Sequence, residues 1–159
     1  MTRFFDLDEA NATLPEVRTI LELLRDERAE LIRLRDQVLE HQAAEEAPSE
    51  TPTEAKVRGA GRSSESSEPT ESQVAANEAE IRVLRLRMQG VIDQMQAGVA
   101  RIDELGITLR EIETGLIDFP ALASGRQIWL CWRLGEDDIG WWHELSDGFG
   151  GRRTLAELT

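Results

Sequence analysis

The sequence predicts an α+β protein in which a long antiparallel helical hairpin precedes a small antiparallel sheet of about four strands. Two long stretches place apolar residues three and four positions apart, which is typical of helices that pack along a seam. A segment rich in Ser, Glu and Pro separates these stretches. The last third of the chain changes to alternating apolar and polar residues, which indicates strands. A chain of 159 residues suffices for one modest domain.

The first helix is predicted over residues 15–44. Pro15 suits the first turn of a helix, so we expect this helix to begin near Leu14. Before it, Asp6 or Asp8 can cap a short helical turn. The apolar seam, interrupted only by Glu27, consists of Val17, Ile20, Leu24, Leu31, Leu34 and Val38. Further aliphatic residues widen the seam and indicate more than one partner surface; these are Leu14, Leu21, Ile32 and Leu39.

Residues 45–72 are predicted to be a disordered insertion at the tip of the hairpin. They hold three of the five prolines, and Val57 is their only large aliphatic residue. Such a segment cannot bury enough apolar surface to offset the entropy lost on ordering.

The second helix is predicted over residues 73–105, with Ser72 as its cap and Gly106 as its stop. Its seam keeps the spacing of three and four over the whole length. Gly98 lies on the seam, where the lack of a side chain lets the partner backbone come close. Asn77 also lies on the seam and either fixes the register or is solvated near the helix start; we favour the solvated position.

Residues 107–159 are predicted to form the sheet and a tail. Alternating segments separated by short turns favour an antiparallel meander, with strands over 107–112, 115–119, 126–134 and 139–145. The tail after residue 145 is rich in glycine and ends in a short strand or a turn.

The register of the third and fourth strands follows from the assumption that GEDD (135–138) is a four-residue loop. This loop pairs Leu134 with Ile139, Trp132 with Trp141, Leu130 with His143, and Ile128 with Leu145, which gives one nearly apolar face. The opposite face is mixed and carries Trp129, Cys131, Arg133, Trp142 and Glu144. We expect the apolar face to pack on the hairpin beside Leu14 and Leu21. A slip of one residue would exchange the two faces.

The charge of the chain argues against nucleic acid and membrane partners. Lys and Arg number 18 and Asp and Glu number 31, which gives a net charge of −13, and phosphate backbones and anionic lipids repel such a chain. No stretch approaches the ~20 apolar residues of a membrane span, and the first residues hold no apolar run of signal-peptide length. Cys131 is the only cysteine, which suits a reducing compartment. We therefore expect an acidic cytoplasmic protein.

Three segments carry a resemblance to a known family: FDLDEANATLPEVR near the start, GLIDFPAL in the middle, and IWLCWRLGEDDIGWWHELSDGFGGR near the end. They resemble the bacterial and archaeal domain of unknown function 2203 family, and the resemblance covers almost the whole chain apart from residues 45–72. It implies a small cytoplasmic protein without an established activity. The positions that match the family pattern are Asp118, Trp132, Gly135, Glu136, Trp142, His143, Glu144, Gly148 and Arg152.

Metal binding needs three or four convergent ligands. The chain offers ligand types near its end, namely Asp118, Cys131, His143, Glu144 and Asp147, but in no CxxC, HxxxH or HExxH spacing. His143 and Glu144 are adjacent on a strand and point to opposite faces, and the assumed register also separates His143 from Cys131. His143 and Asp118 are the candidate metal ligands. The interpretation that we favour for His143 is a buried histidine hydrogen-bonded to a carboxylate.

A small-molecule site is predicted where the mixed sheet face meets the GFGGR turn. Tryptophans beside charged side chains suit a flat or charged ligand, and they equally suit packing under the N-terminal segment. The candidate ligand-binding residues are Trp129, Arg133, Trp142, Glu144 and Arg152.

The sequence favours a non-enzymatic interaction or scaffold module over an enzyme. A lone hairpin cannot cover the aliphatic residues outside its seams, so we expect a homo-oligomer formed through the hairpin, or a complex with another helical protein. The alternative is a small-molecule-binding or metal-binding protein, or an enzyme, that uses the tryptophan-rich sheet face. The sequence identifies no cofactor and no catalytic residue.

Overall fold

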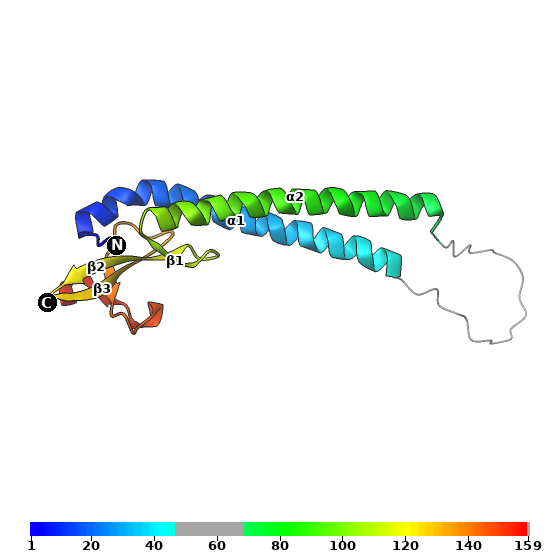
Figure 1. Cartoon of the computed structure of the whole chain (residues 1–159). Coiled ribbons are helices and arrows are strands. Elements are labelled where there is room, and N and C mark those ends of the chain that lie inside the picture. The colour runs from blue at the N-terminus through cyan, green and yellow to red at the C-terminus, as the bar shows by residue number, and fades with distance from the viewer. Residues whose placement is uncertain (47–68, 159) are drawn as a thin grey trace, which may run out of the picture. The chain divides into compact units, whose positions relative to one another are not determined.

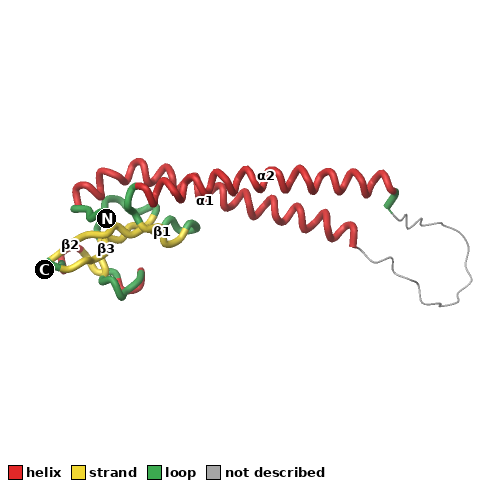
Figure 2. The backbone as a smooth tube through the Cα atoms, viewed as in Figure 1, coloured by secondary structure: helices red, strands yellow, loops and turns green. Residues whose placement is uncertain are grey.

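The computed structural model describes residues 1–46 and 69–158, in which two helices precede five strands (Figure 1). Helix α1 spans Leu7–Glu46 and helix α2 spans Glu71–Glu104. The strands are β1 (Thr108–Glu111), β2 (Leu116–Ala123), β3 (Arg126–Arg133), β4 (Trp141–His143) and β5 (Arg153–Thr154). They form one antiparallel sheet in the order β1-β2-β3-β4-β5, which confirms the predicted α+β class (Figure 2). Most of the predicted tip insertion, residues 47–68, lies outside the described residues.

Helix α1 begins earlier than predicted and includes Pro15. Asp6 caps it through a reciprocal pair of hydrogen bonds: the Glu9 amide donates to Asp6 Oδ1 at 2.7 Å, and the Asp6 amide donates to Glu9 Oε2 at 3.1 Å. A proline costs a helix mainly the hydrogen bond to the carbonyl four residues earlier. Residues on both sides of Pro15 are buried in the core, notably Leu14 and Val17, and this burial holds the helix together across the proline.

Helix α2 begins two residues before the predicted start. Thr70 rather than Ser72 caps it, because the Gln73 amide donates to Thr70 Oγ1 at 3.3 Å and the Thr70 amide donates to Gln73 Oε1 at 2.9 Å. The helix ends before Gly106, which has a φ of +83° as expected of a helix-terminating glycine.

The described residues divide into two compact units, residues 1–31 with 90–158 and residues 32–46 with 69–89. In the second unit, α1 and α2 pack through Leu34, Val38, Ile81 and Leu84. Asn77 joins the helices there: its Nδ2 donates to the His41 carbonyl at 3.0 Å and to Glu45 Oε1 at 2.8 Å, and its Oδ1 lies 2.6 Å from His41 Nδ1. Asn77 therefore fixes the register between the helices, and its predicted solvated position is wrong.

The first unit holds the main core, in which one face of the sheet covers the helices. Cross-strand pairs join Ile117 to Trp132 and Phe119 to Leu130, and these four side chains are at most 3% exposed. The helices contribute to the same core Leu14, Val17, Leu21, Leu24 and Ile102. Alternate residues of β2 and β3 thus bury one face, as period-two patterning predicts.

Gly98 of α2 is the point of close helix approach in the first unit. A Cβ built on it would lie 3.0 Å from Leu24 Cδ2 and 3.6 Å from Ile20 Cγ2. Gly98 thus makes room for side chains of α1, and a larger residue there would require Leu24 to shift.

The register of β3 and β4 differs by one residue from the predicted one. Trp142 joins the core at 2% exposure, whereas Trp141 and Leu145, which were predicted in the apolar face, are 37% and 52% exposed. His143 is buried as predicted, but on the face away from the helices. The observed pairs are Trp129 with His143, Leu130 with Trp142, and Cys131 with Trp141.

The physical reason for the shift lies in the loop of residues 134–140, which is not a tight hairpin turn. The Ile139 amide donates to Asn11 Oδ1 of α1 at 2.8 Å, and Ile139 itself is buried in the core. The Glu136 side chain turns back and accepts the Arg133 amide at 2.7 Å. These contacts lengthen the connection and displace β4 by one position, which exchanges its two faces.

Candidate functional site

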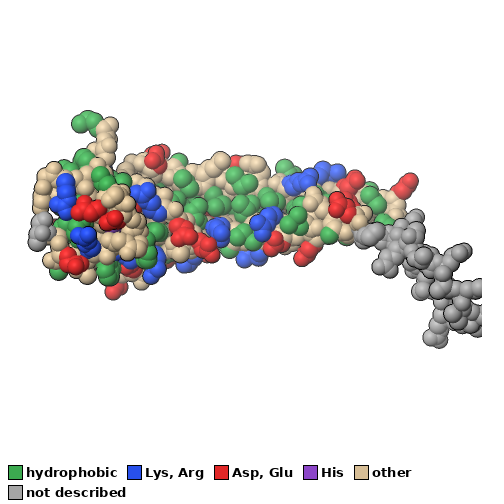
Figure 3. Space-filling view, turned by 90° about the horizontal axis from the view of Figure 1, so that it is seen from below, with side chains coloured by type: hydrophobic (Ala, Val, Ile, Leu, Met, Phe, Trp, Pro, Cys, Tyr) green, Lys and Arg blue, Asp and Glu red, His purple; other side chains and the backbone are tan. Residues whose placement is uncertain are grey.

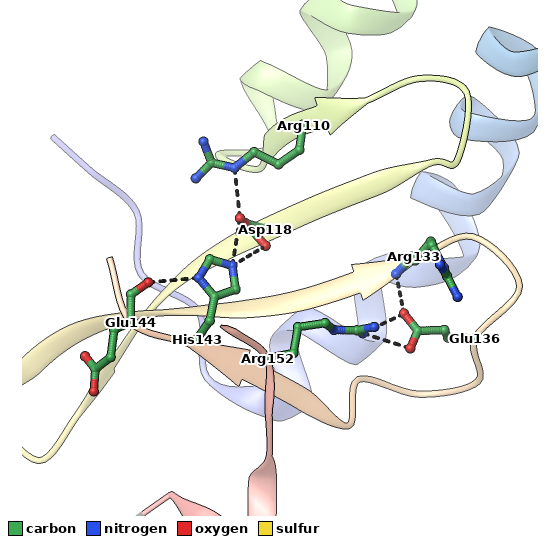
Figure 4. A network of polar contacts seen from close by, with 7 residues as sticks. All are labelled: Arg110, Asp118, Arg133, Glu136, His143, Glu144 and Arg152. Carbon is green, nitrogen blue, oxygen red and sulfur yellow. Dashed lines mark hydrogen bonds and ion pairs between the residues drawn. The ribbon is translucent and has the colours of Figure 1, made fainter. Parts of the chain in front are cut away.

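A cluster of polar side chains lies on the sheet face that points away from the helices. In the observed register Asp118 of β2 is opposite Cys131 of β3, and His143 of β4 is opposite Trp129 of β3. Residues that are opposite each other, or two apart, share a face of a sheet. Asp118, Cys131 and His143 therefore lie on one face, and β1 adds Arg110 beside them (Figure 4).

The three central side chains are buried and close together. Asp118 and His143 are each 2% exposed and Cys131 is 1% exposed. One ligand atom from each, a carboxylate oxygen, the thiol sulfur and an imidazole nitrogen, all lie within 4.8 Å of one another. We call Asp118, Cys131 and His143 the DCH cluster.

Hydrogen bonds on both sides orient the imidazole of His143. Its Nδ1 lies 2.9 Å from the Glu144 carbonyl oxygen, which can only accept, so Nδ1 carries a hydrogen and donates. Its Nε2 lies 3.1 Å from both carboxylate oxygens of Asp118 (Figure 4). A hydrogen bond between Nε2 and the carboxylate requires one proton, which either His143 or Asp118 can carry. A bound cation can replace that proton.

The carboxylate of Asp118 is held from a third side. Arg110 Nε donates to Asp118 Oδ2 at 2.8 Å. The Arg110 guanidinium also lies over the ring of Trp129, 4.9 Å from its centroid, which limits its movement. Arg110 thus fixes the orientation of Asp118 and offsets its charge.

The thiol of Cys131 is protonated at neutral pH. Burial, followed by the nearby negative charge of Asp118, raises the pKa of Cys131 to about 12. A thiol in this state is not a nucleophile by itself. A metal ion that displaces the proton would make it a thiolate ligand.

The DCH cluster forms one wall of a pocket of about 250 Å³. The segment after β4 contributes part of the remaining lining. The remaining lining residues are Arg110, Leu116, Leu145, Asp147, Gly148 and Phe149.

One family of known proteins matches almost the whole chain. The model of a family described as an uncharacterized conserved protein (DUF2203) matches residues 3–155. The chain belongs to the DUF2203 family. No curated protein and no solved structure matches the chain. Neither helix, within the parts of this DUF2203 chain that the structure describes, is long and apolar enough to cross a membrane.

The five residues predicted to bind a ligand do not all share a face in this DUF2203 protein. Trp142 lies in the core on the helix side, with its Nε1 donating to the Thr154 carbonyl at 3.1 Å, so its predicted place on the mixed face is wrong. Trp129 is half-buried on the opposite face under Arg110. Glu144 forms an ion pair with Arg126 at 2.8 Å, which lowers the pKa of Glu144.

Arg133 and Arg152, the other two predicted ligand residues, meet at Phe149. The guanidinium of Arg152 lies between the rings of Trp141 and Phe149, at 4.8 Å and 4.6 Å from their centroids. Its Nη2 donates to both carboxylate oxygens of Glu136, at 2.7 Å and 2.8 Å (Figure 4). The Arg133 guanidinium lies 5.1 Å from the Phe149 centroid. This arrangement ties the β3–β4 loop to the segment that lines part of the pocket.

Two residues of the site were not among the predicted site residues. Cys131 was considered as a ligand type, but the assumed register placed it on the face opposite His143. Arg110 was not singled out, although it lies in the same alternation as Thr108, which is opposite Asp118. Side chains two positions apart on a strand share a face. The position of Arg110, two residues after Thr108, was therefore the signal that could have placed it beside Asp118.

Proposed function

We propose that this protein binds a divalent transition-metal ion, with Zn²⁺ as the best fit, through Asp118, Cys131 and His143. The observation that carries the proposal is the DCH cluster itself: three different ligand atoms, on three neighbouring strands, buried and within 4.8 Å of one another. A reducing cytoplasm would keep the Cys131 thiol available as a ligand.

The donor set suits a borderline ion rather than Mg²⁺ or Ca²⁺, because one nitrogen and one sulfur accompany a single carboxylate. Zinc forms bonds of about 2.0–2.3 Å with these donors, so ligand atoms around a tetrahedral ion lie about 3.3–3.8 Å apart. Side-chain shifts of about 1 Å would bring the DCH cluster to that spacing.

Contacts around the cluster match those that support metal ligands. His143 donates its Nδ1 hydrogen to a backbone carbonyl, which fixes the tautomer that leaves Nε2 as the ligand atom. Asp118 accepts the Arg110 hydrogen bond on Oδ2, and its Oδ1 faces His143 Nε2 at 3.1 Å, where an ion can replace the proton between them. Both ligands are therefore oriented before an ion binds.

Metal content and cobalt spectroscopy test the proposal. Protein purified without chelator should contain close to one equivalent of zinc, measured by inductively coupled plasma mass spectrometry. Metal-free protein titrated with Co²⁺ should develop a thiolate-to-cobalt charge-transfer band that saturates at one equivalent. Cys131→Ser should abolish the band, and Asp118→Asn should weaken cobalt binding by about 10–100-fold.

Two control variants test whether a loss of Co²⁺ binding is specific to the DCH cluster. Asp138→Asn changes an exposed aspartate of the β3–β4 loop, and His41→Gln changes the other histidine of the chain, in the second unit. Both should bind Co²⁺ like the parent protein. A folded parent protein that shows no charge-transfer band and no bound metal would contradict the proposal.

Self-association is a second candidate function, supported by exposed aliphatic side chains on the helices. In the first unit, Val99 of α2 belongs to an open apolar groove of about 560 Å³ that also includes Leu31, Ile92, Met95 and Ile112. In the second unit, Leu39, Val83 and Leu86 are 54%, 51% and 74% exposed. Figure 3 shows hydrophobic side chains gathered over the helices between charged ones. Apolar strips of this kind are typical of interfaces.

Sedimentation tests this second candidate. The parent chain should sediment as a homo-oligomer at tens of micromolar, and Ile32→Glu combined with Leu86→Glu should give a monomer. Leu122→Glu is the matched control, because Leu122 is 60% exposed on β2 rather than on a helix. A parent chain that is monomeric at this concentration contradicts self-association and leaves metal binding unaffected.

A further inference from the structure

We infer that the fourth coordination position of the metal site is open to the pocket and takes a small organic carboxylate, which Arg110 also binds. This inference rests on the proposed metal binding and names the ligand class of that site. It predicts an exchangeable ligand position rather than a closed structural site.

The pocket gives the first argument. Asp118, Cys131 and His143 all line it, so an ion held between them would face the pocket rather than the core. A volume of about 250 Å³ is below the usual range for drug-sized ligands and suits a small one. Leu116, Leu145 and Phe149 line the remainder, which favours a carboxylate with a short apolar tail over an inorganic anion.

Charge gives the second argument. A divalent ion is balanced by the thiolate of Cys131 and the carboxylate of Asp118, while His143 is neutral as a ligand. Arg110, which lies against Asp118, then leaves one net positive charge at the site. An anion bound in the pocket would neutralise this positive charge.

The geometry of Arg110 gives the third argument. Its Nε donates to Asp118, and the guanidinium lies over the ring of Trp129, which limits its movement. Among the described residues, none accepts a hydrogen bond from its Nη groups, and the side chain is 41% exposed. A guanidinium with two free nitrogens matches the two oxygens of a carboxylate.

Asp147 is the competing occupant of the fourth position. It lines the same pocket and carries a carboxylate, but it is exposed and does not belong to the group of ligand atoms within 4.8 Å. If Asp147 moved onto the ion, it would neutralise the charge and close the site. The experiment must therefore distinguish an added carboxylate from Asp147.

Cobalt-loaded, full-length protein titrated with sodium propionate tests the inference. We expect the visible d–d bands of Co²⁺ to shift and saturate, while the thiolate charge-transfer band persists. Arg110→Leu should weaken propionate binding by at least about tenfold. Arg110→Lys should restore part of the affinity, and Arg28→Leu, on α1, should leave it unchanged. Asp147→Asn should bind Co²⁺ like the parent protein and respond to propionate at least as strongly.

Three results would overturn the inference. If Co²⁺ binds but propionate leaves the d–d bands unchanged in both the parent protein and Asp147→Asn, the fourth position is not open to a carboxylate, and the metal site stands. If Asp147→Asn weakens Co²⁺ binding and changes the d–d bands, Asp147 is the fourth ligand. If no cobalt charge-transfer band forms, both the metal site and the carboxylate site are refuted.

Discussion

Truncation of the two adjacent tryptophans of β4 should destabilise the protein by clearly different amounts. Trp142 is 2% exposed in the core, and its Nε1 hydrogen bond to the Thr154 carbonyl joins β4 to β5. Trp142→Ala should lower the free energy of unfolding by ~3–5 kcal/mol, the range for a large buried aromatic residue. The lost hydrogen bond adds about 1 kcal/mol to that figure.

Trp141→Ala should cost clearly less. Trp141 is 37% exposed, and its main partner is the Arg152 guanidinium at 4.8 Å from the ring centroid. Loss of a partly exposed cation–π contact and of partial burial amounts to about 1–2 kcal/mol. The predicted difference between the two variants is therefore at least about 2 kcal/mol, which is larger than the error of a urea extrapolation for a small protein.

Urea unfolding followed by far-ultraviolet circular dichroism measures this difference without relying on tryptophan fluorescence. Trp129→Ala serves as a further comparison, because Trp129 lies on the face of the DCH cluster. If Trp141→Ala were the more damaging substitution, the two faces of β4 would be exchanged. Cys131 and His143 would then lie on opposite faces and could not bind one metal ion.

Three further predictions concern stability. Gly98→Val should destabilise the protein by about 1–3 kcal/mol in urea, because the added Cβ would already lie 3.0 Å from Leu24; Gly90→Val, with open space at its Cβ, is the control and should cost clearly less. Asn77→Ala should cost about 1–2 kcal/mol, since it removes the bonds to His41, and a change within error would contradict a register role. Burial raises the pKa of Cys131 from an ordinary 9.0 to about 12. This shift stabilises the native state below pH 9, and the stabilisation is lost as the pH rises toward 12. With chelator present, the free energy of unfolding should therefore fall by about 1 kcal/mol per pH unit over that window, and Cys131→Ala should flatten this slope.

Local patterns in the sequence were enough to predict the element types. The spacing of three and four predicted both helices, and the alternation along residues 126–133 predicted the buried face of β3. The capping pair of Asp6 and Glu9 and the stop at Gly106 are equally local. These features depend on neighbours within a few residues, which is why a single sequence contains them.

The start of α1 and the register of β4 depend on distant contacts, and the sequence did not predict them. Pro15 is tolerated because the residues around it are buried against the sheet. The β3–β4 loop takes its length from the bond between Ile139 and Asn11, which are 128 positions apart. No local signal distinguishes this loop from the four-residue turn that GEDD suggests.

The same loop explains why the functional site was harder to predict than the fold. Whether Cys131 and His143 share a face depends on one residue of register, because side chains alternate along a strand. Two sets of contacts in the β3–β4 loop accompany the observed register: the Ile139 amide donates to Asn11, and Glu136 accepts the Arg133 amide and binds Arg152. The clamp of Arg152 between two aromatic rings also anchors the segment that lines part of the pocket. Glu136 and Arg152 are thus suited to position the proposed metal ligands, Asp118, Cys131 and His143.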